Sequence, residues 1–370
     1  MSIVMIDDIV SSLNLPPMVW MLYYVSIVAS ALMGSFLSKR TKLSQFLIGW
    51  MALGSIFSFL PFLLPSITLE FMAIFSVLLG ASFGLGMPSS LAYFADHTFI
   101  ENRGRIGGLI LLSVNLGALP LAIPFITFDY RVNSLILAIW RGIGLIFLLV
   151  WRPKDKIQQE RRRQASLISL FNNRAFMLYL VPWIMFSFVD RFGGEILGRE
   201  LIEVIIGSFS AFAGGFLSDR IGRKRVVVYS FVMLGLAYGI MGIAPTLLVS
   251  KYIYVIFDGL AAGMLSLMFI FVLWGDLSPS DLREKYYVIG SAPLFLTYIA
   301  PLFLLPYVSV VPPAATFSLA SFFLFLAVLP LIYAPETLPE KKIRLRQLRS
   351  YAERAKKASE KYFKKPDAAS

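Results

Sequence analysis

The sequence of 370 residues has no cysteine, a single histidine and few charged residues, 15% in all. Without cysteine the protein can form no disulfide, no thiolate metal site and no cysteine nucleophile. His97 offers little metal chemistry, and Asp7 and Asp8 are the one adjacent acidic pair. An integral-membrane transferase would need such residues clustered near the interface to hold a metal. We therefore predict no metal site, no cofactor and no enzymatic activity.

Apolar residues dominate instead, at 58% of the chain, which is too many for a soluble domain of this length. The apolar runs are long enough for α-helices that cross a bilayer, and they lack the alternation of a β-barrel. We predict an all-α polytopic membrane protein with eleven spans. They lie near 17–38, 43–65, 69–95, 105–126, 133–151, 175–190, 201–217, 225–244, 252–275, 286–306 and 312–333.

The distribution of the 34 Lys and Arg residues predicts how the chain is oriented. If the loop that contains Lys39 is cytoplasmic, the alternating loops and the C-terminus hold 29 of them. Basic residues accumulate on the cytoplasmic side of membrane proteins. The N-terminus is then outside and the C-terminus inside, in the plasma membrane. The net charge of +12 is explained by topology, so we expect no nucleic-acid partner.

The two halves of the sequence repeat each other. Asp96, Glu101 and Arg103 recur in the second half, all at one constant offset, as Asp276, Asp281 and Arg283. We call this the repeat offset. Gly34 recurs as Gly215 at an offset one position longer. Two pseudo-symmetric helical bundles of five and six spans are the simplest explanation. The predicted organisation is an N-terminal bundle (1–151), a cytoplasmic linker (152–174), a C-terminal bundle (175–334) and a basic cytoplasmic tail (335–370).

The repeat offset places the partner of the span at 175–190 before Met1. The repeat thus predicts that the N-terminal bundle lacks its first helix. Two explanations stand open: a start codon placed too late, or a truncated protein.

A short basic turn between two apolar runs carries the most informative motif. Residues 215–224 read Gly-Phe-Leu-Ser-Asp-Arg-Ile-Gly-Arg-Lys. The segment resembles the cytoplasmic signature loop of the major facilitator superfamily, G-x-L-a-D-r-x-G-r-k, at every defined position. The resemblance implies a secondary transporter whose bundles rock against each other, and in which this loop stabilises the outward-facing state.

Each residue type in this loop suits a latch between helices. Gly215 permits close approach of two helices, and Gly222 can adopt a positive φ. Asp219 can accept hydrogen bonds from amides at a helix N-terminus. Arg220 and Arg223 can pair with carboxylates on adjacent helix ends, with Asp276 the nearest candidate. The predicted latch residues are Gly215, Asp219, Arg220, Gly222, Arg223, Lys224, Asp276, Arg283, Asp96 and Arg103.

The alternative is a basic turn that only anchors the topology, which needs neither the aspartate nor the glycines. The first half has a degraded copy, with Ser38 where Asp219 stands and Thr41 where Gly222 stands. We expect the latch to be weaker there.

Charges inside the spans are the candidates for a substrate or proton site. Asp258 could bind a proton and couple uptake to a gradient, or it could stay hydrated near the outer interface. Arg141 lies in mid-span, where snorkelling or structural pairing competes with substrate binding. Trp183, Ser187 and Asp190 share one helix face. On the next span Glu203 shares a face with small residues, so these faces either line a cavity or pack closely.

Finer resemblance favours a small polar solute carried with protons. The D-x6-R spacing of Asp96 and Arg103, and Pro335-Glu336-Thr337 after the last span, resemble the sugar porter branch. The segment 182–192 lacks that branch's glutamine pair, and 117–124 lacks the G-P-x-x-G-G element of multidrug antiporters. A multidrug-type efflux antiporter and a transport-inactive sensor or remnant remain alternatives. We expect a monomer whose partners are a small-molecule substrate, protons and the lipid bilayer.

Overall fold

The structure is a computed structural model that describes residues 17–63, 68–152, 168–192, 199–308 and 310–339. The predictions for the N-terminal segment before Pro17 and for the basic tail from Glu340 onward lie outside the described residues. The same holds for most of the predicted linker between the bundles.

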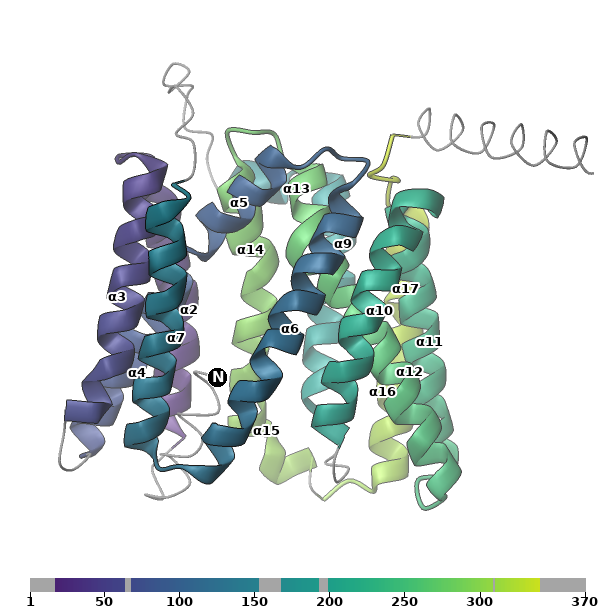
Figure 1. The fold of residues 1–370 in the computed structure, drawn as a ribbon. Helices are drawn as coiled ribbons and strands as arrows, with labels where there is room; N and C mark the ends of the chain where they lie inside the picture. Colours follow the sequence, from purple (N-terminus) through teal and green to yellow (C-terminus); the bar gives the residue numbers. More distant parts are fainter. Residues whose placement is uncertain (1–16, 64–67, 153–167, 193–198, 309, 340–370) are drawn as a thin grey trace, which may run out of the picture.

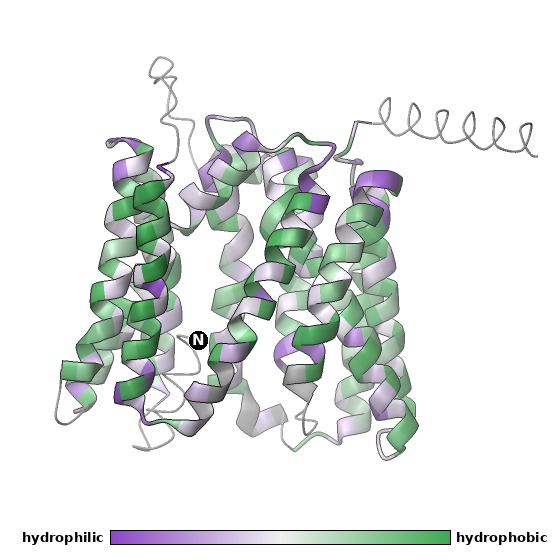
Figure 2. Cartoon of the chain, viewed as in Figure 1, coloured by the Kyte–Doolittle hydropathy of each residue, from purple (hydrophilic) through white to green (hydrophobic). Residues whose placement is uncertain are grey.

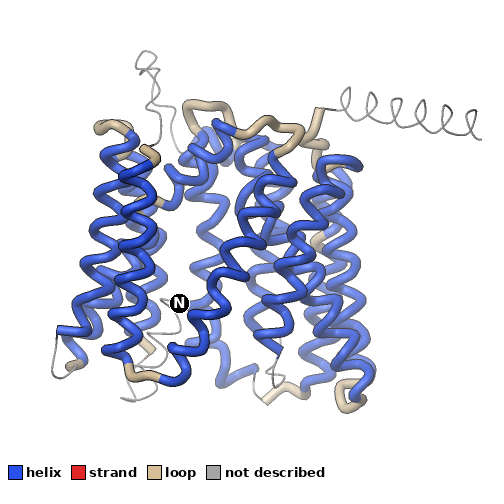
Figure 3. The backbone as a smooth tube through the Cα atoms, in the orientation of Figure 1, coloured by secondary structure: helices blue, strands red, loops and turns tan. Residues whose placement is uncertain are grey.

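The described part of the chain is all-α, and no strand occurs in it (Figure 3). The first half contains α2 (Met18–Leu37), α3 (Leu43–Leu63), α4 (Leu69–Gly84), α5 (Met87–His97), α6 (Arg103–Thr127) and α7 (Tyr130–Val150). The second half contains α8 (Ile168–Phe171), α9 (Arg174–Val189), η1 (Asp190–Phe192), α10 (Arg199–Ile221), α11 (Arg223–Ile243), α12 (Leu248–Ser266), the π-helix η2 (Leu267–Val272), α13 (Leu273–Leu277), α14 (Arg283–Leu296), η3 (Thr297–Ile299), α15 (Ala300–Val308), α16 (Pro313–Leu326) and α17 (Val328–Tyr333).

Within the described residues, ten helical segments are long and apolar enough to cross a membrane. The predicted span at 175–190 is the exception, because it forms the shorter apolar helix α9, of 16 residues. Of the eleven predicted spans, ten are therefore long apolar helical segments in the structure, and the remaining one is a shorter apolar helix. Figure 2 shows apolar residues along the middle of the helices and polar residues at their ends.

The helices form two bundles (Figure 1). In the first half α2 packs on α4 and α3 on α7, and in the second half α10 packs on α12 and α11 on α16. The halves meet along two contacts, α6 with α10 and α2 with α14, which we call the α6–α10 seam and the α2–α14 seam. We call the end of the helices at which α5 and α13 finish the latch end, at the top of Figure 1, and the opposite end the far end.

Glycines show that the packing repeats between the halves. A side chain at Gly84 on α4 would overlap the carbonyl of Ile27 on α2. A side chain at Gly263 on α12 would overlap Gly207 on α10 in the same way. Only glycine permits backbones to approach so closely. The repeat offset maps the first pair onto the second to within one position, so the repeat in the sequence is also a repeat in the packing.

Two spans are not regular α-helices. The helix that begins as α12 continues through the π-helix η2 into α13, and π-helical turns occur frequently at functional sites. The helix that begins as α14 is interrupted by η3 before α15. Pro293 and Pro301 flank this interruption. Because proline has no amide proton, each removes one hydrogen bond from the helix.

Candidate functional site

The carboxylate of Asp219 lies at the latch end of the α6–α10 seam and is 1% exposed. It accepts hydrogen bonds from the backbone N–H groups of Gly104 (3.1 Å) and Arg105 (2.9 Å), which are in the first turn of α6. The first amides of a helix have no partner within the helix, and the helix dipole favours an anion there. A side chain at Gly215 would overlap the carbonyl of Gly104, so glycine is needed for the two helices to come this close.

Asp276, at the end of α13, is the acidic centre of the latch and has a fully buried side chain. It forms ion pairs with Arg103 of α6 and with Arg223 of α11, whose Nε lies 3.3 Å from Oδ2. Arg223 also pairs with Asp219 and donates to the carbonyl of Ile100 at 2.6 Å. The two acids and two arginines form a buried group whose formal charges cancel.

The repeated residues pair reciprocally between the halves. Arg103 of the first half pairs with Asp276 of the second, and Arg283 of the second pairs with Asp96 of the first. Each arginine also donates from Nε to a nearby hydroxyl at 3.2 Å: Arg103 to Thr98 Oγ1 and Arg283 to Ser278 Oγ. All three pairs of equivalent residues are related by the repeat offset. Each half therefore supplies an acid to the arginine of the other.

Glu336 belongs to this network, although the sequence alone did not identify it as a latch residue. Its carboxylate accepts from the N–H groups of Arg223 (2.8 Å) and Lys224 (3.2 Å), at the start of α11. The preceding residue, Gly222, has a φ of 109° and no side chain with which to cap the helix. The Pro335-Glu336-Thr337 segment was the sequence feature from which this contact could have been found. Its third residue also takes part, since Thr337 Oγ1 donates to Asp276 at 3.3 Å.

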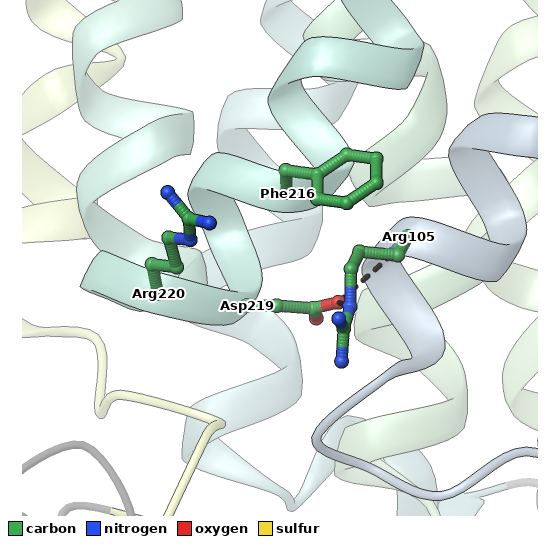
Figure 4. A pocket seen from close by; sticks show the side chains of 4 residues that line it. All are labelled: Arg105, Phe216, Asp219 and Arg220. Carbon is green, nitrogen blue, oxygen red and sulfur yellow. Dashed lines mark hydrogen bonds and ion pairs between the residues drawn. The ribbon is translucent and has the colours of Figure 1, made fainter. Parts of the chain in front are cut away.

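The remaining basic residues of the loop differ in their contacts. Lys224 Nζ donates to the carbonyl of Ile332 at 2.7 Å. Arg220 lines a pocket of about 190 Å³ together with Arg105, Phe216 and Asp219. Figure 4 shows Asp219 pointing across the seam toward Arg105, whereas Arg220 extends away from it. Arg220 is exposed and forms no ion pair with another described residue, so the predicted pairing with a carboxylate is found for Arg223 and not for Arg220.

At the latch end, the α2–α14 seam has different contacts from the α6–α10 seam. Gly34 faces Leu85, which directly follows α4, and Gly214 faces Met264 of α12. Packing therefore makes Gly214 the equivalent of Gly34, in agreement with the repeat offset and not with the longer offset that aligns Gly34 with Gly215. It follows that Lys39, not Ser38, occupies the place of Asp219.

The polarity of this second contact is reversed. Lys39 Nζ donates to the carbonyl of Asp281 at 3.1 Å, and Ser38 Oγ lies 2.9 Å from both carboxylate oxygens of Glu284. Glu284 occupies the position of Gly104 on the other seam. The basic residue is thus on the loop and the acidic residue on the helix, and the halves remain in polar contact although this loop has no aspartate.

Three of the predicted intramembrane residues lie on the helices α9, α10 and α12 of the second bundle. Trp183 is 1% exposed, and its ring stacks on Phe269 of the π-helix η2, with ring centroids 4.5 Å apart. Trp183 Nε1 has no hydrogen-bond partner among the described residues. Asp258, also 1% exposed, lies about 15 Å along α12 from the far end. The backbone of Glu203 packs beside Gly259, next to Asp258 in the chain.

Of the other two candidates, one lies at the far end of the second bundle and one in the first bundle. Asp190 is on η1 at the far end and pairs with Arg191 at 3.4 Å. Arg141 is in the first bundle, where it donates to the carbonyl of Gly54 (3.0 Å) and to Ser82 Oγ (2.9 Å). These contacts join α7 to α3 and α4, as expected for the structural role that the sequence left open. The structure therefore does not bring all five candidates into one site.

Comparison with known proteins identifies the class that this fold and latch define. The model of the Major Facilitator Superfamily matches residues 2–194 and 202–367, so the chain belongs to this family of membrane solute transporters. No curated protein matches the sequence.

Two of the solved structures that match illustrate the shared fold. One is the proton:xylose symporter XylE bound to 6-bromo-6-deoxy-D-glucose, with a TM-score of 0.65, 16% identity and coverage of 85% of each chain. The other is the human organic anion transporter MFSD10 (TETRAN), with a TM-score of 0.65, 14% identity and coverage of 88% of each chain.

Proposed function

We propose that the protein is a secondary active transporter of the plasma membrane that works by alternating access. The latch end faces the cytoplasm, and the bundles assigned to 1–151 and 175–334 rock against each other. The observation that carries this proposal is the reciprocal pairing of Arg103 with Asp276 and of Arg283 with Asp96. These contacts hold the two halves together at one end, and they must separate for that end to open.

We further propose that transport is coupled to protons through Asp258. A buried carboxylate within a span is costly when charged, and a bound proton removes that cost. The π-helix that follows Asp258 in the same span and the stacked Trp183 provide an irregular, aromatic region in the same bundle. The substrate that suits this region is a small polar solute. One of the transporters with the same fold is a proton:xylose symporter, which makes D-xylose a suitable first probe.

The test is uptake of D-xylose into proteoliposomes with and without an inward proton gradient, extended to a panel of small sugars and organic anions. Gradient-dependent uptake that Asp258→Asn uncouples from the gradient would support the proposal. Glu70→Gln is the matched control, since Glu70 is exposed in the first turn of α4. Substrate-driven proton release in the opposite direction would indicate an antiporter. Binding of a probe without flux would indicate a sensor and overturn the proposal.

A further inference from the structure

The far end of the α2–α14 seam holds a stack of four planar groups. Trp20 and Tyr24 of α2 are stacked with ring centroids 5.9 Å apart, and Tyr24 stacks on Tyr298 of η3 at 4.6 Å and an interplanar angle of 7°. The guanidinium carbon of Arg191 lies 3.5 Å from the centroid of the Tyr298 ring. The contact between Tyr24 and Tyr298 crosses the seam, because the first belongs to the N-terminal half and the second to the C-terminal half.

This stack and the latch lie at opposite ends of the molecule. Tyr24 is in the second turn of α2, whereas Ser38 follows the last residue of that helix at the latch end. A helix rises about 1.5 Å per residue, so about 21 Å separates the two contacts along the helix axis. Movement that opens the seam at one end need not disturb the other.

Tyr298 is also at the interruption between α14 and α15. Pro293 and Pro301 lie on either side of it, and neither can donate a backbone hydrogen bond. Thr297 Oγ1 donates to the carbonyl of Pro293 at 2.8 Å. The helix can therefore bend at Tyr298 with fewer hydrogen bonds to break than a regular helix would have.

The equivalent place on the α6–α10 seam has no such stack. The repeat offset maps Tyr24 onto Val204 and Tyr298 onto Ala118. Val204 is 42% exposed, and neither residue is aromatic. The stack is thus not a consequence of the repeated fold. It is a feature of one seam, added to helices that pack well without it in the other half.

We infer that the aromatic stack of Trp20, Tyr24, Tyr298 and Arg191 is the far-side gate of the transport path, which opens when Tyr24 and Tyr298 separate. This inference rests on the proposed alternating access and adds to it the residues that close the second side. Arg191 lies over the ring as a cation and is held there by its ion pair with Asp190 (3.4 Å). Tyr298 therefore has a ring on one face and a guanidinium on the other.

A buried reporter below the gate allows a direct test. Phe295 is one turn from Tyr298, is 9% exposed and faces Phe83 of α4 across the seam at 5.7 Å. Since the chain contains no cysteine, Phe295→Cys supplies the only thiol. Its reaction rate with a membrane-impermeant methanethiosulfonate reagent is measured from each side in oriented proteoliposomes. All variants are compared with this single-cysteine parent.

Tyr298→Ala should raise labelling from the far side about tenfold, since it removes both the ring stack and the cation–π contact. Tyr298→Phe retains the ring and should label like the parent. Arg191→Gln should give a smaller increase than Tyr298→Ala, because only the cation is lost. It provides a second measure if Tyr298→Ala reaches the membrane poorly.

Equal far-side rates in the parent, Tyr298→Ala and Arg191→Gln would overturn the gate, as would an increase confined to the latch side. The readout does not depend on flux. Altered labelling without transport of any probe would contradict the proposed function and leave the gate standing. Transport of a probe with unaltered labelling would support the proposed function and contradict the gate.

Discussion

Neutralising Asp276 tests whether the buried latch controls the conformation. Its side chain is fully buried against Arg103 and Arg223, whose side chains are 5% and 0% exposed. Asp276→Asn preserves the shape of the side chain but leaves two buried guanidiniums facing a neutral amide. Breaking a buried ion pair by removing one partner costs about 3–5 kcal/mol. We therefore expect the ratio of latch-closed to latch-open molecules to fall by about two to nearly four decades.

The internal repeat provides a matched control in the same protein. Asp96 is the repeat equivalent of Asp276, but it is less buried: in its ion pair with Arg283 the two side chains are 22% and 14% exposed. Water can solvate Arg283 when its partner is neutral, and Arg283 retains Ser278 as an acceptor. Asp96→Asn should then cost about 1 kcal/mol, or about fivefold in the same ratio.

The measurement is a distance distribution between two spin labels by pulsed electron paramagnetic resonance. Arg40→Cys and Arg225→Cys place labels on exposed residues of the two halves at the latch end, in a chain without other thiols. Asp276→Asn should transfer most of the distribution to longer distances, and Asp96→Asn should change it only slightly.

In Asp276→Asn, Arg223 keeps its ion pair with Asp219 but Arg103 loses its ion pair, so adding Arg103→Gln removes that uncompensated charge and should restore part of the closed population. If Asp276→Asn and Asp96→Asn give the same distribution, burial does not set the strength of the latch. The reasoning would also be wrong if the double variant opened further than the single one.

Two further outcomes follow from the loop after α10. Asp219→Asn should slow transport several-fold without reducing the amount of protein in the membrane, because it weakens the acceptor for two amides of α6. Arg220→Gln should change neither the transport rate nor the amount of protein, because the Arg220 side chain is exposed. Gly222→Ala should lower thermal stability by about 1–2 kcal/mol, because a φ of 109° is unfavourable for alanine and a Cβ there would overlap the carboxylate of Glu336. Uptake and membrane content, measured together, check the prediction for Asp219→Asn and Arg220→Gln. A thermal-shift assay checks the prediction for Gly222→Ala.

The sequence predicted those features whose cause is local. Hydropathy located the helices because a bilayer requires long apolar runs. The loop at 215–224 predicted the contact of Asp219 with a helix N-terminus and the pairing of Arg223 with Asp276, and the structure contains both contacts. The positive φ of Gly222 was likewise foreseeable, since a turn between two long helices needs such a residue.

Contacts between residues far apart in the sequence could not be predicted in this way. Glu336, near the end of the described chain, caps the start of α11, and Tyr24 of the first described helix stacks on Tyr298 in the other half of the chain. Neither residue has a neighbour in the chain that specifies its partner. The assignment of Ser38 to the place of Asp219 failed for a related reason. An alignment of motif letters paired Gly34 with Gly215, whereas the packing pairs it with Gly214.

The two seams share a fold and differ in where their strong contacts lie. The α6–α10 seam has Asp219 on helix amides at the latch end and only Val204 and Ala118 at the places of the far-end stack. The α2–α14 seam has the Tyr24–Tyr298 stack at the far end. Ionic contacts suit an end where separated charges can be solvated by water, and stacked rings suit a place where little water is available. The buried ionic contacts of Asp219 are on the α6–α10 seam and the far-end stack is on the α2–α14 seam, so substitutions in one of these two sets should shift the balance of states without altering the contacts of the other.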